Sequence, residues 1–332
     1  MKTPRLGTVL SCCLAVFAAV SSAHAQEVSA YIPDPLVGSY APEQGCEPAW
    51  LVRAGTIVLH RSAPGAAILV TDAPGTTVLL GSADFDFGFR AGPDVSLIRR
   101  GTIGDVECRF FRIDGWNAVG PTITSAAGAA VQFQTPFLFQ GPVTLSSNYR
   151  SELENCELNF RYTMSDWLTL LAGFRYVELN ERSLAMALDL GGGATADFSV
   201  SAFNALYGFQ VGADALLWSR GGRLRLEGTG RIGAYNNRAS NRSSLVLTGG
   251  PDYLASAATD HAALVGELGL SLVYQFTPRF GARAGYELLW IDGAALASEQ
   301  LAATRLADGI GDIDPLGSAF FHGATVSLEY TW

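Results

Sequence analysis

Three histidines and one acidic neighbour are the side chains of this sequence best suited to acid–base chemistry. His60, His261 and His322 follow the first 25 residues, and Asp260 directly precedes His261. A carboxylate that orients an imidazole can turn it into a general base, so Asp260 and His261 are a candidate hydrolytic dyad. No G-x-S-x-G turn presents a serine nucleophile. We therefore predict that the protein is not an enzyme, and a hydrolase is the weakest alternative.

The segment "DGIGDIDP" (308–315) offers carboxylate oxygens, which are ligands that calcium prefers. Its aspartates lack the order of an EF-hand loop, and acidic loops of this kind are usually only solvated. The glycine-rich segment 188–198 is not followed by a helix that could hold a phosphate at its N-terminus. The sequence thus predicts no catalytic residue, no metal site and no cofactor.

Many charged residues fall in segments where they alternate with apolar ones. In "GGRLRLEGTGRIGAY" (221–235), the odd positions carry arginines and a glutamate, and the even positions carry leucines, glycines, an isoleucine and an alanine. Successive side chains of a strand point to opposite faces. In a soluble sheet the apolar face would cover a core, whereas in a membrane barrel it contacts lipid and the charged face lines the lumen.

Ten segments alternate in this way. They lie at 49–60, 83–92, 103–113, 155–162, 167–177, 203–218, 221–235, 264–276, 280–290 and 320–332. Their connections are alternately short, as at 163–166 and 277–279, and long, as at 178–199 and 236–261. This rhythm is typical of an up-and-down barrel with short periplasmic turns and long outer loops. A secreted two-sheet β-protein is the alternative, but it has no reason to alternate its loops.

The sequence therefore predicts an all-β, integral outer-membrane, up-and-down antiparallel β-barrel of about ten strands. An additional hairpin formed by 131–139 and 143–147 would raise the number to 12. Aromatic residues gather beside the short turns and at the C-terminus, as an interfacial girdle would. They are Trp167, Trp218, Tyr274, Phe276, Phe280, Tyr330 and Trp332.

The two ends of the chain and its composition agree with an envelope location. Residues 1–25 combine a basic start, an apolar stretch and the small-residue site Ala23-His24-Ala25, which predicts a cleaved signal peptide. Proline-rich residues 26–48 are a periplasmic lead-in, and 49–332 form the barrel. Charged residues are 16% of the chain, below the usual ~25%. The net charge of −9 argues against a nucleic-acid partner.

Several blocks resemble a known family. "ECRFFRIDGW", "LLAGFRYVELNE" and "YQFTPRFGARAGYELLW" are similar, in order, to recurring blocks of the β-barrel porin-7 family, outer-membrane proteins expanded in planctomycete-type bacteria. The likeness covers about residues 48–332. It implies an integral outer-membrane barrel, with a pore among its roles, and it carries no catalytic motif that could be transferred.

The last residues resemble the C-terminal signal that the barrel-assembly machinery reads. That signal ends in an aromatic residue with apolar residues two, four and six positions earlier, and Val326, Leu328, Tyr330 and Trp332 fit it. Outer-membrane lipid and this machinery are thus the predicted partners, together with small solutes or ions.

The charged face of the ten segments gives the predicted lumen. The residues expected to line it are Arg53, Asp84, Asp86, Arg90, Asp105, Glu107, Arg109, Glu157, Arg161, Arg175, Asp214, Arg225, Glu227, Arg231, Glu267, Arg283 and Glu287. A narrow barrel buries such charges at a cost unless each has a partner. Two functions follow: a small porin-like passive pore with a charge-lined lumen, or a structural or adhesive surface barrel plugged by interlocked salt bridges.

Overall fold

The computed structural model describes residues 49–332 except 73–74, 76, 126–129, 134–136, 141 and 190–193. The predicted signal peptide and periplasmic lead-in lie outside the described residues. In the described part of the chain, no helix has the length and apolar character needed to cross a membrane.

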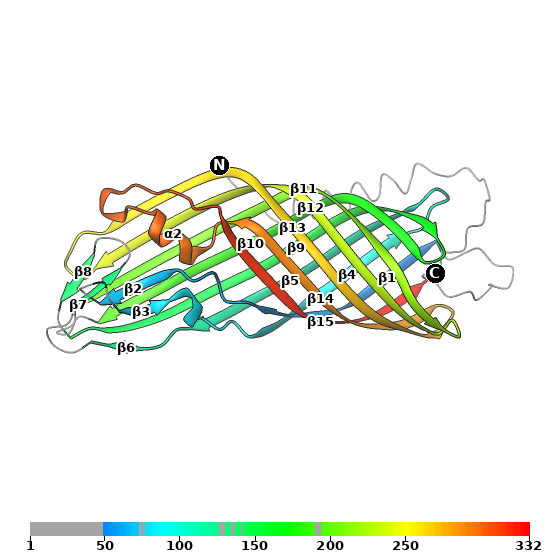
Figure 1. Ribbon diagram of the computed structural model, residues 1–332, viewed down its shortest axis with the longest axis horizontal. Helices are drawn as coiled ribbons and strands as arrows, with labels where there is room; N and C mark the ends of the chain where they lie inside the picture. Colours follow the sequence, from blue (N-terminus) through cyan, green and yellow to red (C-terminus); the bar gives the residue numbers. More distant parts are fainter. Residues whose placement is uncertain are drawn as a thin grey trace.

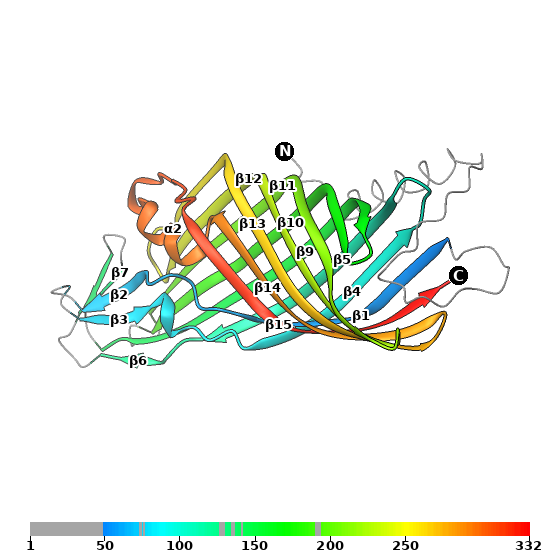
Figure 2. The same cartoon turned by 45° about the vertical axis from the view of Figure 1, so that its right-hand side comes forward.

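Ten antiparallel strands close into a barrel, as predicted (Figures 1 and 2). Each strand pairs with its neighbours along the chain, and the ring closes where the first strand, β1, pairs with the last, β15. The strands are β1 (Trp50–Arg61), β4 (Phe89–Arg99), β5 (Asp105–Val119), β9 (Thr144–Ser165), β10 (Leu168–Asp189), β11 (Thr195–Arg220), β12 (Leu224–Leu247), β13 (Tyr253–Thr277), β14 (Phe280–Ala294) and β15 (Gly317–Thr331).

The remaining elements gather at the end of the barrel opposite the C-terminus (Figure 1). They are the strands β2 (Ile68–Asp72), β3 (Val78–Gly81), β6 (Ile123–Thr124), β7 (Ala130–Phe133) and β8 (Leu138–Gln140), the helix α2 (Ala297–Ala303), and the 3₁₀ turns η1 (Ser82–Asp84) and η2 (Leu306–Asp308). β7 pairs with β8 and β2 in a separate small sheet. The additional hairpin therefore does not widen the barrel.

Several strands are about twice as long as the segments that predicted them. β12 continues to Leu247 and β13 begins at Tyr253, so strand fills most of the long loop predicted at 236–261. β10 and β11 likewise occupy most of the gap predicted at 178–199. The alternation criterion missed these extensions because the chemistry of the two faces changes along each strand.

β9 shows this change. Near the short turn, its inward side chains are polar, as at Glu157 and Arg161, and its outward ones are apolar, as at Phe160. Further along, the inward side chains include buried Tyr149 and Leu153, while outward positions 146–152 carry serine, asparagine, arginine and glutamate. The first half thus matches a strand in a bilayer, and the second half matches a strand with water outside and a core inside.

An exposed apolar belt surrounds the half of the barrel near the short turns. Phe209 is 76% exposed, Val211 59% and Ile232 53%, all on outward faces of β11 and β12. The belt is hollowed by an apolar groove of about 710 Å³. Aromatic rings border the edge of the belt that is nearest the short turns, where Trp50 stacks on Trp332 with ring centroids 6.4 Å apart. A contiguous belt of this kind contacts lipid, and a closed barrel is the form in which strands span a membrane. The chain is an integral outer-membrane β-barrel.

The second barrel strand lies later in the chain than predicted. The sequence placed it at 83–92, but residues 82–84 form η1 and β4 begins at Phe89. Phe85 and Phe87 were expected to contact lipid and are instead buried in the interior core. Their alternation with acidic residues is that of an extended segment at the barrel mouth whose phenylalanines face the core and whose aspartates face water, and the period of two is the same in either case.

Candidate functional site

The interior of the membrane-spanning half is filled by ion pairs, with Glu267 near the centre. Its carboxylate lies 2.8 Å from guanidinium nitrogens of Arg109 and Arg175 and 2.9 Å from one of Arg231. These arginines also surround Glu157, at 3.5 Å from Arg231 and 3.8 Å from the other two. All five side chains are almost completely buried and come from five different strands, so the network ties opposite walls of the barrel together.

Hydrogen bonds satisfy the carboxylate of Glu157 further. The side-chain amides of Asn155, Asn159 and Gln210 donate to it over 2.9, 3.2 and 2.7 Å. A buried charge is tolerated when it is both paired and hydrogen-bonded, and Glu157 has partners of both kinds.

A second cluster lies near the C-terminal strand. Glu329 accepts hydrogen bonds from the Nε atoms of Arg53 and Arg283, both over 2.9 Å. Arg283 also pairs with Glu227, whose other oxygen lies 3.1 Å from Nε of Arg225. Because β1, β12, β14 and β15 each contribute a charge, this cluster closes the seam between the first and last strands.

Two further arginines connect the rest of the charged set. Arg161 lies 3.2 Å from Glu107 and 3.0 Å from Asp214. Arg109 lies 3.2 Å from Asp94 and 3.0 Å from Glu287.

All but four of the residues predicted to line the lumen take part in these ion pairs. The exceptions are Asp84, Asp86, Arg90 and Asp105. Asp84 and Asp86 alternate with the interior Phe85 and Phe87 and are exposed, so their placement in the lumen was wrong.

Arg90 and Asp105 lie at strand ends. Arg90 is exposed where β4 no longer pairs with β5, and it donates to the backbone carbonyls of Phe89 and Gly115. Asp105 accepts a hydrogen bond from the backbone N–H of Gly101 in the short turn.

Two members of the network were missed by the set predicted from the sequence. Asp94 was missed because the strand that carries it was placed too early in the chain. Glu329 lies on the polar face of the last predicted strand, and that position was the signal that could have found it.

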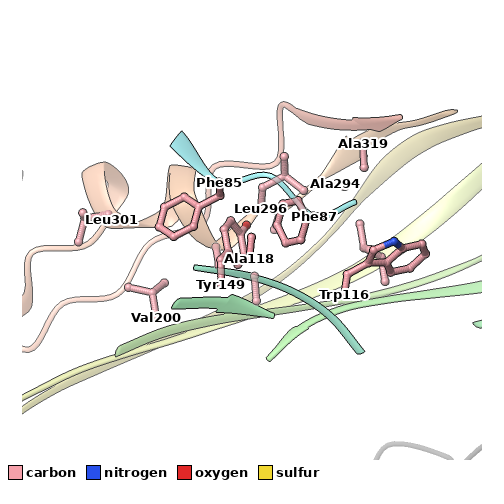
Figure 3. Packing of buried hydrophobic residues seen from close by; sticks show 14 of the residues in the cluster. Phe85, Phe87, Trp116, Ala118, Tyr149, Val200, Ala294, Leu296, Leu301 and Ala319 are labelled. Atoms are coloured by element: carbon pink, nitrogen blue, oxygen red, sulfur yellow. The ribbon is translucent and has the colours of Figure 1, made fainter. Parts of the chain in front are cut away.

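The interior beyond the membrane-spanning half is an apolar core. Phe85, Phe87, Trp116 and Tyr149 are at most 1% exposed, and residues 294–301 around α2 pack into the same cluster (Figure 3). The indole N–H of Trp116 donates to a backbone carbonyl of β1 over 3.2 Å. Segments between strands therefore fold back into the barrel mouth and fill it.

A buried ion pair holds α2 in this core. Glu181 pairs with Arg61 and accepts a hydrogen bond from the hydroxyl of Tyr149, and all three side chains are at most 1% exposed. The backbone N–H of Ala297, the first residue of α2, donates to Glu181 over 2.8 Å. The guanidinium of Arg61 also lies 4.2 Å from the ring centroid of Phe87. This cluster thus fixes both α2 and the segment that contains Phe87 to the wall of the barrel.

Glu299 of α2 lies outside the membrane-spanning segments, in the mouth of the barrel. Burial, together with the nearby carboxylates of Asp314 and Glu181, raises its pKa to about 7. One of its carboxylate oxygens is buried without a hydrogen-bond partner. A neutral Glu299 therefore suits this position better than an ionised one.

The structure does not assemble the two candidate sites considered from the sequence, the Asp260–His261 dyad and the acidic segment 308–315. Asp260 and His261 point to opposite faces of β13, and Nε2 of His261 lies 2.8 Å from the backbone carbonyl of Gly293. The side chains of Asp312 and Asp314 accept hydrogen bonds from backbone N–H groups of their own loop. Within the described ranges, no three His, Cys, Asp or Glu side chains are gathered around a position for a metal ion.

Comparison with known proteins gives similarity in structure alone, since no family model and no curated protein matches the chain. The outer membrane protease OmpT from Escherichia coli is 8% identical over 85% of this chain and 96% of its own, with a TM-score of 0.49. The P. putida toluene transporter TodX is 12% identical over 91% of this chain and 95% of its own (TM-score 0.37). The Ralstonia pickettii toluene transporter TbuX is 10% identical over 86% and 90% (TM-score 0.34). At this level of similarity, none of them indicates an activity for this chain.

Proposed function

We propose that this protein is a closed outer-membrane barrel whose work is structural or adhesive and is done by its outer rim. The observation that supports this proposal is the filling of the interior along its length. Ion pairs occupy the membrane-spanning half, and an apolar core that contains α2, Phe85 and Phe87 occupies the outer half. A barrel of ten strands is narrow enough for side chains to fill most of it.

The porin-like pore predicted from the sequence requires a continuous water-filled path lined by charges that can act on passing ions. Here Arg109, Arg175, Arg231, Glu157 and Glu267 are each bound by partners of opposite sign. Paired charges hold one another in place and offer a passing ion little net field. This pairing favours the plugged barrel over the pore.

Single-channel recording of purified protein in planar bilayers tests the proposal. We expect no steady openings from protein whose insertion is verified by a mobility shift between unboiled and boiled samples on a gel. As a matched control, the segment 294–316 that contains α2 is replaced by a short glycine–serine linker. If the intact protein conducts steadily at the same level as this variant, the closed barrel is refuted and the pore is supported.

We also propose that the barrel-assembly machinery recognises the C-terminal strand. The outward side chains of Val326, Leu328, Tyr330 and Trp332 are between 44% and 55% exposed, so they form one apolar face. Replacement of Trp332 by serine should lower the amount of protein in the outer membrane, whereas Thr331→Ser on the inward face should not. Equal amounts of the two variants would contradict this recognition.

A further inference from the structure

Two histidines lie side by side on the outer surface of the barrel, remote in sequence from each other. His60 on β1 and His322 on β15 are directly opposed in the antiparallel pairing. Their ring centroids are 5.0 Å apart, with an angle of 30° between the ring planes. Directly opposed cross-strand residues have Cβ atoms about 4.5–5.5 Å apart on one face of a sheet, so the pairing register itself fixes this juxtaposition.

Polar groups continue this pair on both sides. The hydroxyl of Tyr286 lies 2.7 Å from Nδ1 of His322. On the other side, a carboxylate oxygen of Asp86 lies 3.6 Å from Nε2 of His60, and the Asp86 side chain is 88% exposed. Nδ1 of His60 is buried and has no hydrogen-bond partner. In the tautomer that carries the proton on Nε2, this nitrogen has a free lone pair that can bind a metal ion.

The pair sits at the outer edge of the membrane. Trp50, which stacks on Trp332 near the short turns, precedes His60 by ten residues of the same strand. At about 3.3 Å per residue and a tilt of about 40°, this separation is roughly 25 Å along the membrane normal, the height of the apolar band. Phe89 and Phe320 flank the pair with ring contacts to His60 and His322. Ions in the external solution can therefore reach it.

We propose that His60 and His322 chelate one divalent first-row transition-metal ion, with water completing its coordination. A metal–nitrogen distance of about 2.0–2.1 Å and a tetrahedral angle place two imidazole centroids about 5 Å apart, and the observed separation is 5.0 Å. Rotation of each ring about χ2 would turn one of its nitrogens toward a shared ion.

The surrounding groups suit this chemistry. If the oxygen of Tyr286 accepts the Nδ1 proton of His322, Nε2 of that ring carries the lone pair that binds a metal, in the manner of outer-sphere partners elsewhere. Asp86 supplies negative charge next to the site. Imidazole nitrogen favours copper, nickel and zinc over calcium and magnesium. Two protein ligands are enough for a chelate, so the site needs no third side chain.

Copper(II) titration of the detergent-solubilised protein, purified without a histidine tag, tests the proposal. We expect one equivalent to bind, with an electron paramagnetic resonance spectrum that shows two nitrogen ligands. His60→Ala and His322→Ala should each weaken binding at least tenfold and reduce the spectrum to one nitrogen. His261→Gln is the matched control, because this histidine points into the barrel, and it should change neither reading.

Two further outcomes decide the assignment. Tyr286→Phe should weaken binding several-fold and leave both nitrogen ligands in the spectrum, since it removes only the orienting hydroxyl. Retention of tight, two-nitrogen binding after His322→Ala would overturn the proposal, as would a failure of the intact protein to bind copper. The unboiled-gel mobility shift of each variant verifies that it is folded, so loss of binding is not mistaken for loss of structure.

Discussion

At the scale of single residues, the barrel depends on carboxylates that are buried but fully partnered. Glu157 is 0% exposed and is surrounded by three arginines and three amides. Removal of its negative charge costs much free energy, because the surrounding arginines cannot lose their protons and would remain buried as unpaired positive charges. The stability of the membrane half should therefore be sensitive to each acidic member of the network.

Replacement of Glu157 by glutamine should destabilise the barrel by about 3–5 kcal/mol, the usual cost of breaking a buried ion pair from one side. The temperature at which the unboiled protein changes its mobility on a gel reports this loss. Asp252→Asn, in the exposed connection between β12 and β13, is the control and should leave that temperature unchanged. Equal temperatures for both variants would show that the network contributes little to stability.

Residue types alone predicted most of this network, and the physical reason is the alternation itself. Arg225, Glu227 and Arg231 share one face because a strand has a period of two. The partners of each charge could not be predicted, because they depend on how strands distant in sequence approach across the lumen. Arg109 and Glu267, for example, are joined by a hydrogen bond of 2.8 Å across 158 residues of chain.

At the scale of elements, α2 is a short helix that Glu181 holds at its N-terminal end. It carries Glu299, a carboxyl group that suits its position better when neutral. Helices this short are not stable by themselves, so α2 depends on its docking. Burial raises the pKa of Glu299 to about 7 from 4.5. Its contribution to docking is therefore fully present below about pH 4.5 and is lost as the pH rises through about 7.

Hydrogen exchange of the α2 amides, corrected for intrinsic rates, should therefore become faster between pH 5 and pH 8. Glu299→Gln should remove this dependence, because the amide does not titrate. Asp308→Asn changes an exposed acid in η2 nearby and should leave the profile as it is. A pH dependence that persists in Glu299→Gln would assign the effect to another group.

The sequence did not predict that residues 85–87 and α2 lie at the mouth of the barrel and contribute to its core. Residues 85–87 alternate like a strand in lipid, and the sequence contains no sign that this stretch turns inward. α2 was predicted as part of a long loop. Both elements are stabilised by contacts with several strands at once, such as those of Arg61 and Glu181, and no local pattern encodes such contacts.

At the scale of the whole molecule, the barrel continues well beyond the bilayer. Residues 236–247 of β12 would extend roughly 30 Å above the apolar belt at the usual rise and tilt of a barrel strand. Arg238 and Arg242 lie on the outer surface of this extension, and their backbones pair with β11 on one side and β13 on the other.

Trypsin added to outer-membrane vesicles should therefore not cleave after Arg238 or Arg242, since proteases require an extended and unpaired backbone. Asp252→Arg introduces an equivalent residue into the connection at 248–252 and should create a cleavage site. The masses of the fragments separate the two cases. Cleavage at Arg238 in the unaltered protein would mean that this region is a loop, as the sequence alone suggested.

The exchange of polar and apolar faces halfway along β9 and its neighbours constrains how the strands can align. A slip of one residue between two strands turns every side chain to the opposite surface. In the half near the short turns, that error would push guanidinium groups into the hydrocarbon of the membrane. In the other half, it would expose the side chains of tyrosine and leucine to water. A strand pairing shifted by one residue is therefore unfavourable both in the lipid-facing half and in the water-facing half. Each half of the barrel thus specifies the correct register independently.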